Sequence, residues 1–184
     1  MDREDARQLF HIFVGLTAIA VLFFLGRGFL LAAAFFTIII GTLLINARLL
    51  GARIGIADWF VERFERKEAP LPGWGSACYA AGALIAVSFL TDTGQIASVL
   101  LALGVGDGIS TIIGRRGRMR LPYNSKKTLE GALGIFFPSL LAWYFIGPLA
   151  VPFAVVATIA ESVPRLDDNL TIPALCTAFL MVAV

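Results

Sequence analysis

Asp107 is the residue whose position most clearly suggests chemistry, because its carboxylate lies inside a run of apolar residues. A charged residue at the centre of a membrane helix costs about 2.5 to 3.5 kcal/mol on insertion scales, so it is a functional candidate by default. Asp107 could bind a metal ion or accept a proton. Gly104, Gly108 and Thr111 fall on the Asp107 face of the helix, at spacings of three or four within this set. A neighbouring helix or a ligand could approach the backbone closely there.

A basic stretch follows this apolar run and could bind an anion. Lys126 and Lys127 precede Thr128, which can cap a helix, and Glu130 would then lie in the first turn. A helix N-terminus beside two ammonium groups is a good site for the phosphates of a nucleotide. Four arginines precede these residues: Arg115, Arg116, Arg118 and Arg120. They could add to the anion site, or they could only mark the cytoplasmic side and attract anionic lipids.

Oxygen-bearing side chains near the end of the chain suit a divalent cation. They are Glu161, Asp167, Asp168 and Asn169. Hard oxygen ligands in a short stretch suit Mg²⁺ that bridges to phosphate groups. The alternative is that these are solvated turn residues, with Asp168 or Asn169 as the cap of the last helix.

Arg7 and His11 form a fourth candidate pair. They stand four residues apart, so they face the same way on a helix. They could contribute to a site, or they could anchor the first helix at the membrane interface.

These candidates need a helical membrane scaffold, since the chain is 58% apolar against about 45 to 50% for a soluble domain. Its mean hydropathy is +0.84, and a membrane helix takes roughly 20 apolar residues. Apolar runs occur near residues 9–26, 28–47, 74–90, 95–113, 131–147, 149–162 and 170–184. We therefore predict an all-α polytopic membrane protein of one domain, residues 1–184, with about seven transmembrane helices. The last two runs are short and could fail to cross. No cleavage pattern follows the first run, so we expect it to remain as a helix.

Two polar segments interrupt these runs. Residues 48–73 combine charges at helical spacing with Trp59, Phe60 and Phe64. This pattern is typical of an amphipathic helix in the membrane interface, which would make the segment an amphipathic cytoplasmic linker. Residues 114–130 form a basic cytoplasmic loop.

The charges predict a cytoplasmic N-terminus, because cytoplasmic loops carry an excess of Lys and Arg. With seven helices, only Arg27 of the 15 basic residues and only Asp92 of the 13 acidic residues would lie outside. The inside residues beyond the main clusters include Arg66, Lys67 and Arg165. Acidic residues follow the rule weakly, so their gathering on this face indicates a site there. We expect an integral protein of the plasma membrane or endoplasmic reticulum whose active site faces the cytoplasm.

Familiar soluble kinase folds are excluded by motif and composition together. The sequence has neither a Gly-x-x-x-x-Gly-Lys-Ser/Thr loop nor the motifs of soluble protein kinases. Residue types and spacing alone therefore support a cytoplasmic-facing membrane site for an anionic, phosphate-bearing ligand.

Three blocks stand in the same order as the signatures of one enzyme family. The central block comprises Gly106-Asp107-Gly108, the Gly114-Arg115-Arg116 step and Lys126-Lys127-Thr128-Leu129-Glu130-Gly131. The C-terminal block comprises Glu161-Ser162 and Leu166-Asp167-Asp168-Asn169. The N-terminal block, Arg7-Gln8-Leu9-Phe10-His11, is similar to an Arg-Lys-x-x-His pattern with Gln8 in place of the usual Lys. In these blocks, and nearly end to end, the sequence resembles the polyprenol kinase family of dolichol kinases, phytol kinases and CTP-dependent diacylglycerol kinases.

The resemblance implies a single membrane-embedded lipid kinase domain. Such an enzyme transfers the γ-phosphoryl group of CTP to the hydroxyl of a membrane lipid alcohol, which would be dolichol or another polyprenol, a phytol-like prenyl alcohol, or diacylglycerol. This transfer depends on positioning and charge neutralisation, so Mg²⁺ or another divalent cation is expected together with CTP. The implied partners are the lipid alcohol, the nucleotide and the bilayer, and no nucleic acid.

The resemblance also implies roles for individual residues. Asp107, His11 and Arg7 would be catalytic. The nucleotide-binding residues would be Gly108, Thr111, Gly114, Arg115, Arg116, Lys126, Lys127, Thr128 and Glu130. The metal ligands would be Asp107, Glu161, Asp167 and Asp168.

Two other functions fit parts of the sequence. The Lys-Lys-Thr-x-Glu-Gly stretch from Lys126 to Gly131, with its upstream Asp107, is also similar to CTP-phosphatidate cytidylyltransferases. In that reaction a lipid phosphate attacks the α-phosphorus of CTP and pyrophosphate leaves. A transporter or lipid-binding protein with a polar gate would bind its ligand without turning over nucleotide.

Overall fold

The computed structural model of the chain describes residues 3–64, 70–163 and 167–183. Within these ranges the regular structure is helical, as the composition predicts, apart from one short β-hairpin. Arg66, Lys67 and Arg165, which the charge argument assigns to the cytoplasmic side, lie outside the described residues.

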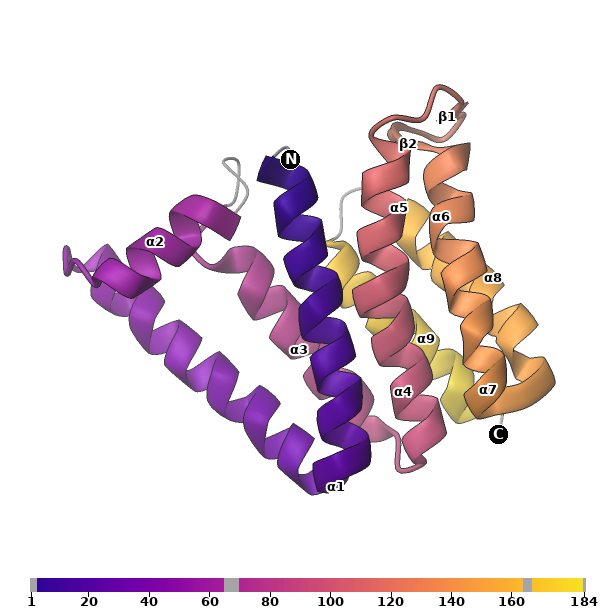
Figure 1. Cartoon of the computed structure of the whole chain (residues 1–184), viewed down its shortest axis with the longest axis horizontal. Coiled ribbons are helices and arrows are strands. Elements are labelled where there is room, and N and C mark those ends of the chain that lie inside the picture. Colours follow the sequence, from indigo (N-terminus) through magenta and orange to yellow (C-terminus); the bar gives the residue numbers. More distant parts are fainter. Residues whose placement is uncertain (1–2, 65–69, 164–166, 184) are drawn as a thin grey trace.

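The first helix, α1 (Arg3–Leu49), is bent at Gly26 into two arms (Figure 1). Gly26 has φ 84° and ψ 169°, a conformation that is essentially restricted to glycine. The first arm, residues 3–25, packs within the bundle, whereas the second arm, residues 27–49, diverges from it. The first two predicted helices are therefore confirmed as these two arms. Arg27 lies just after the bend, and its guanidinium donates to the carbonyls of Val87 (2.9 Å) and Ser88 (3.2 Å).

The predicted amphipathic segment contains α2 (Gly55–Phe64). Two of its aromatic rings contact Phe10 of the first arm, with ring centroids 5.5 Å away for Phe60 and 4.6 Å for Phe64. Arg48 at the end of the second arm pairs with Asp58 at 3.3 Å. The helix α2 therefore links the two arms of α1 at their far ends (Figure 1).

The next helices form the centre of the bundle. After α3 (Trp74–Phe89), the chain continues as α4 (Thr93–Leu101), a π-helical turn η1 (Ala102–Gly106) and α5 (Asp107–Gly114). The side chain of Asp92 caps α4 by accepting from the Gln95 N–H at 2.8 Å. The side chains of Ile96, Val99, Leu100 and Leu103 are fully buried, so this stretch carries much of the apolar core.

A β-hairpin follows, made of β1 (Arg120–Leu121) and β2 (Asn124–Thr128). The two strands are antiparallel, with Arg120 opposite Thr128. The basic segment 114–130 is thus not only a loop, as the sequence suggests. Its strands are too short and too polar to show the alternating apolar pattern from which strands are predicted.

The C-terminal helices pack against α4 and α5 on the side away from the first arm of α1 (Figure 1). The chain runs through α6 (Leu129–Ser139), η2 (Leu140–Ala142), α7 (Trp143–Ile146), η3 (Gly147–Leu149), α8 (Ala150–Ser162) and α9 (Asp168–Ala183). It reverses at Gly147, where φ is 57°, so α6 and α8 form a helical hairpin. Phe153 and Ile172 from these helices complete the core.

The polar elements gather at one end of the molecule. Figure 1 shows the N-terminus, α2 and the β-hairpin at that end, and the bend of α1, the α3–α4 connection and the C-terminus at the other. By length and composition, three stretches of the described residues could cross a membrane: Arg3–Leu49, Thr93–Gly114 and Leu129–Ser162. α3 and α9 are apolar but have only 16 residues each. Large apolar side chains such as Phe24, Phe36 and Phe137 are exposed, as expected for a helical membrane protein.

Candidate active site

Five side chains from different elements form a buried polar cluster near the hairpin end of the bundle. They are His11 on the first arm of α1, Asp107 at the start of α5, Lys127 on β2, Glu161 in the last turn of α8 and Asp168 at the start of α9. Asp107 and Glu161 are only 4% and 2% exposed. The cluster thus brings together residues from all three blocks of the sequence.

Lys127 lies at the centre of the cluster. Its ammonium group donates to Glu161 Oε1 at 2.7 Å and to Asp168 Oδ2 at 2.8 Å. Burial alone would lower the pKa of Lys127, but the carboxylates of Asp168, Glu161 and Asp107 together raise that pKa above its ordinary value. The lysine is therefore charged at neutral pH. It joins the predicted anion site to the predicted metal site.

Two oxygens, one in the cluster and one on the residue next to Asp168, are buried without a hydrogen-bond partner among the described residues. They are Glu161 Oε2 and Asn169 Oδ1. The other oxygen of Glu161, Oε1, also accepts from Ser110 Oγ at 2.7 Å. Leaving a buried acceptor unsatisfied costs about 1 to 3 kcal/mol. These two oxygens therefore suit a ligand that supplies a proton donor or a positive charge.

The His11 ring is fixed by a feature of the helix opposite it. Its Nε2 lies 3.0 Å from the Leu103 carbonyl oxygen and 3.4 Å from Asp107 Oδ2. In a regular α-helix the Asp107 N–H would bond to the Leu103 carbonyl, but in the π-helical turn it bonds to Ala102 and Gly104 instead. Because a carbonyl can only accept, Nε2 carries the proton. The turn thus presents a carbonyl that sets both the tautomer and the position of the histidine.

Arg7 faces the same pocket as His11, as their spacing predicts, together with Tyr79 and Asn169. The guanidinium of Arg7 pairs with the Glu4 carboxylate, and Arg7 Nε donates to Glu4 Oε2 at 3.1 Å. Gln8 is buried and donates to Glu4 Oε1 at 3.1 Å. Glu4 therefore orients the Arg7 and Gln8 side chains within the first turns of this arm.

The predicted helix cap after the basic stretch is confirmed. Thr128 Oγ1 accepts from the Gly131 N–H at 3.1 Å and donates to the Gly114 carbonyl at 3.2 Å. The Glu130 carboxylate accepts from the backbone N–H groups of Arg118 (2.7 Å) and Met119 (3.2 Å). These two residues hold the segment between α5 and β1 in place against the start of α6.

The basic residues divide between the cluster and the surface. Lys126 and Lys127 are neighbours on β2, where successive side chains point to opposite faces, and Lys126 is exposed. Arg115 and Arg116 both reach Asp5 of the first arm, at 3.4 Å and 2.6 Å. The two lysines therefore do not lie together at the helix start as the sequence suggests.

The glycines near Asp107 mark places where helices meet closely. A Cβ on Gly104 would lie 2.7 Å from the Cα of Gly15, and one on Gly108 would lie 2.5 Å from Ile12 Cγ1. A Cβ on Gly114 would lie 3.2 Å from the Cα of Gly131. The sequence left open whether a neighbouring helix or a ligand approaches Gly104 and Gly108. In the structure the first arm of α1 lies against both. Thr111 is half-buried on α5.

Asp167 belongs to the start of α9. Its Oδ1 accepts from the Asn169 N–H at 3.1 Å, and its carbonyl accepts from Thr171 Oγ1 at 3.0 Å. The sequence left open a solvated cap at Asp168 or Asn169. In the structure the residue that accepts from the Asn169 N–H is Asp167, and the Asp168 side chain accepts from Lys127 instead. Within residues 3–64, 70–163 and 167–183, no three His, Cys, Asp or Glu side chains stand close enough to hold a metal ion by themselves.

Sequence reasoning missed Tyr79, Ser110 and Asp5. The rings of Tyr79 and His11 meet edge to face, with centroids 4.4 Å apart. Ser110 could have been found, because it follows Asp107 by three residues and so shares its helix face. The only sequence signal for Tyr79 was its position as a lone tyrosine in the apolar run 74–90. Nothing local marks Asp5, because its partners lie more than 100 positions away.

Comparison with known proteins finds relatives among plant lipid-alcohol kinases. The chain is 32% identical to the probable phytol kinase 2, chloroplastic, of Oryza sativa subsp. japonica, over 98% of this chain and 66% of that protein. It is 28% identical to the farnesol kinase, chloroplastic, of Arabidopsis thaliana, over 93% of this chain and 62% of that protein. An uncharacterized protein of Methanocaldococcus jannaschii is 35% identical over 55% of this chain and 54% of that protein.

The chain thus spans about half to two thirds of the length of these relatives. No family model matches the chain, and no solved structure matches it significantly. Since phytol and farnesol kinases align with nearly all of it, and since the buried polar cluster is built from the blocks that first indicated the resemblance, the chain belongs to the polyprenol kinase family.

Proposed function

We propose that this protein is a CTP-dependent kinase of an isoprenoid alcohol. The observation that carries the proposal is the buried polar cluster, in which carboxylates, an ammonium group and a positioned histidine meet at the polar end of a membrane bundle. Phytol and farnesol, which the names of two relatives specify, are long apolar chains that end in a hydroxyl. A kinase acting on such a molecule needs a polar site beside the hydrocarbon region.

In the proposed reaction the alcohol oxygen attacks the γ-phosphorus of CTP. The bond to the β–γ bridging oxygen breaks, CDP leaves, and the hydroxyl proton goes to a carboxylate. We assign that carboxylate to Asp107, because it is buried and its Oδ2 lies 3.4 Å from His11 Nε2. His11 would keep Asp107 oriented toward the hydroxyl, and Arg7, in the same pocket, would add positive charge.

The basic stretch supplies the proposed nucleotide site. Lys127 lies inside the cluster, and Lys126, Arg115 and Arg116 lie at the surface around the hairpin. Negative phosphate oxygens would compete with Asp5 for the two arginines and share Lys127 with its carboxylates. Thr128 and Glu130 would act by holding the loop in shape, and Gly108, Thr111 and Gly114 by fixing the helix against which the phosphates rest.

The residues present also fit a divalent cation that arrives with the nucleotide. Mg²⁺ is commonly held by one or two carboxylates and by substrate phosphates, so a complete cage of protein ligands is not required. Glu161 and Asp168 with Asp107 would hold it, and the buried oxygens Glu161 Oε2 and Asn169 Oδ1 are suitable acceptors. Such an ion would neutralise the triphosphate. Asp167 would contribute through the start of α9.

We further propose that the chain crosses the membrane about seven times, with the N-terminus and the site facing the cytoplasm. The two arms of α1 and the α6–α8 hairpin each supply two crossings in this proposal. α3, the α4–α5 helix and α9 supply the others. The placement of the N-terminus, α2 and the hairpin at one end supports this arrangement (Figure 1).

The decisive experiment incubates the purified protein in nanodiscs with Mg²⁺, γ-³²P-labelled CTP and a panel of phytol, farnesol, dolichol and diacylglycerol. We expect label in the organic phase with a prenyl alcohol, and less with labelled ATP, GTP or UTP. Labelled pyrophosphate with an added lipid phosphate would instead select a cytidylyltransferase. No transfer of either kind, from folded protein, would contradict an enzymatic role.

A further inference from the structure

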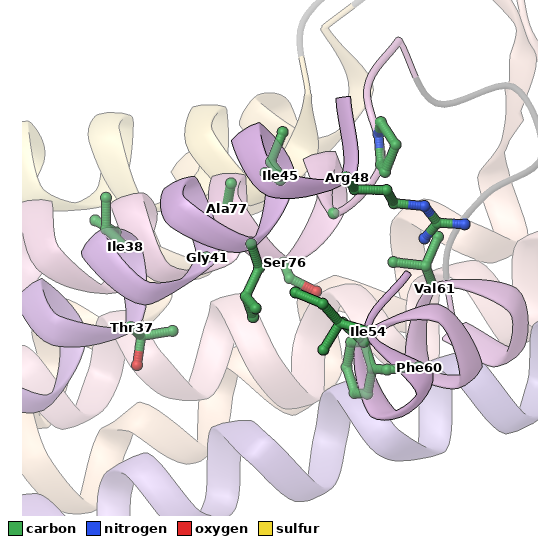
Figure 2. A pocket seen from close by; sticks show the side chains of 14 residues that line it. Thr37, Ile38, Gly41, Ile45, Arg48, Ile54, Phe60, Val61, Ser76 and Ala77 are labelled. Atoms are coloured by element: carbon green, nitrogen blue, oxygen red, sulfur yellow. The ribbon is translucent and has the colours of Figure 1, made fainter. Parts of the chain in front are cut away.

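The bend of α1 leaves an apolar pocket on the side of the bundle. The pocket has a volume of about 380 Å³ and lies between the second arm, α2 and the start of α3. Figure 2 shows Ile38 and Ile45 from the second arm, Ile54 and Phe60 from the α2 region, and Ala77 from α3 around it. Small-molecule sites in proteins measure about 300 to 1,000 Å³, so the pocket is large enough for a ligand.

The apolar pocket continues toward the buried polar cluster. A second pocket, of about 250 Å³, shares Thr37, Phe60 and Ser76 with it. The lining of this second pocket includes His11 and Tyr79, and His11 is 3.4 Å from Asp107. The two pockets therefore make one groove that is apolar at one end and polar at the other.

A molecule that fits such a groove has a long hydrocarbon part and a single small polar end. If each carbon group takes about 30 Å³, close to the share of one water molecule in the liquid, the apolar pocket of about 380 Å³ holds about a dozen of them. This is enough for much of one isoprenoid chain, but not for two acyl chains. Arg48 lines the apolar pocket and lies at the opposite side of the view from Thr37 in Figure 2. Its guanidinium pairs with the Asp58 carboxylate, so an ion pair stands at that end of the pocket.

We propose that this groove binds the isoprenoid chain of the alcohol acceptor and brings its hydroxyl to His11 and Asp107. The proposal rests on the kinase function proposed above and names the acceptor site for it. It also favours single-chain prenyl alcohols over diacylglycerol as substrates.

Gly41 offers a direct test, because it lines the apolar pocket and a Cβ there would meet no atom within 4 Å. A leucine at this position therefore begins in open space and extends into the pocket, and leucine has a higher helix propensity than glycine. Gly28, on the same arm, has equally open space and does not line the pocket, so Gly28→Leu is the matched control. We expect Gly41→Leu to raise KM for phytol or farnesol at least tenfold with KM for CTP unchanged, and Gly28→Leu to change neither. An unchanged KM for the alcohol in Gly41→Leu would overturn the proposal.

Photolabelling separates this proposal from the proposed reaction. The probe is farnesol that carries a diazirine at the end of its chain, and the labelled positions are mapped by mass spectrometry of the full-length protein in nanodiscs. We expect labels on residues 37–48 and 72–77 in wild type and Gly28→Leu, and a strong reduction in Gly41→Leu. Such labelling without phosphoryl transfer would support the groove while contradicting the kinase. Labelling spread evenly over the exposed apolar helices would overturn the groove even if the kinase is active.

Discussion

Lys127 connects the parts of the polar cluster, since one ammonium group serves both Glu161 and Asp168. We predict that Lys127→Met destabilises the protein by about 3 kcal/mol, because removing one partner of a buried ion pair leaves uncompensated charge. The measurement is thermal unfolding in detergent. Lys126→Met is the control, because Lys126 is its exposed neighbour on the same strand. Equal stability of the two variants would contradict the central position of Lys127.

Asp107 carries the proposed proton transfer. We predict that Asp107→Asn, which keeps the size of the side chain, lowers kcat at least about 100-fold, the effect typical of losing a general base. The unfolding temperature should stay close to that of wild type, because asparagine keeps a polar group beside His11. Radiolabel transfer and thermal unfolding measure the two properties on one preparation. Substantial turnover by the asparagine variant would rule out Asp107 as the base.

At this scale the sequence predicted which residues matter better than how they meet. Asp107 was singled out because charge inside apolar sequence is costly and therefore conspicuous. Lys127 was singled out because it precedes a helix cap, and Glu161 and Asp168 because oxygen ligands gather near the end of the chain. Their pairing could not be predicted, since Lys127 and Glu161 are 34 positions apart and Lys127 and Asp168 are 41 apart. Only the packing of α8 and α9 against the hairpin brings them together.

Among the elements, the π-helical turn η1 has the clearest effect on the site, because it presents the Leu103 carbonyl to His11. If His11 only positions Asp107, glutamine should replace it, since its Nε2–H can donate to the same carbonyl. We predict near wild-type kcat for His11→Gln and a loss of about 100-fold for His11→Ala, a size typical of misplaced catalytic groups. An equally inactive His11→Gln would show that the imidazole itself exchanges a proton.

The bend of α1 depends on one residue. Gly26 has φ 84° with ψ 169°, where any side chain is strained by about 1 to 3 kcal/mol. We predict that Gly26→Ala lowers the free energy of unfolding by that amount, and that Gly28→Ala, two positions away in regular helix, does not. Denaturation followed by helical circular dichroism checks both. Equal stability would mean that the two arms can join in another conformation.

The helices were predictable because their apolar runs are long and end at glycine, proline or charged residues, whereas the hairpin was not. The β2 strand consists of Asn124, Ser125, Lys126, Lys127 and Thr128, which offers no apolar face to read. Its position comes instead from pairing with β1 and from the contact of Thr128 with Gly114. The bend at Gly26 was equally hidden, since the sequence shows where the apolar runs break but not the angle between the arms.

In the whole molecule the β-hairpin and the α3–α4 connection lie at opposite ends of the bundle (Figure 1). We predict that single cysteines at Pro122, in the hairpin, and at Thr91, in the α3–α4 connection, react with a membrane-impermeant thiol reagent from opposite sides of the membrane. The hairpin cysteine should be reached from the cytoplasmic side. Cys78 and Cys176 are buried, so the unsubstituted protein serves as the low-labelling control. Labelling of both new cysteines from one side would contradict the proposed orientation.

The hydrogen bonds of Arg27 have a consequence for the order of assembly. They reach the end of α3, 60 and 61 positions further along the chain, so they cannot form until α3 has left the ribosome. In the proposed topology the two arms of α1 therefore enter the membrane as a helical pair before Arg27 can bind the end of α3. Arg27 lacks these two carbonyl acceptors at that stage, and the α3 side of the groove is missing. The arrival of α3 supplies both, which makes this helix the step at which the N-terminal third of the protein becomes fixed.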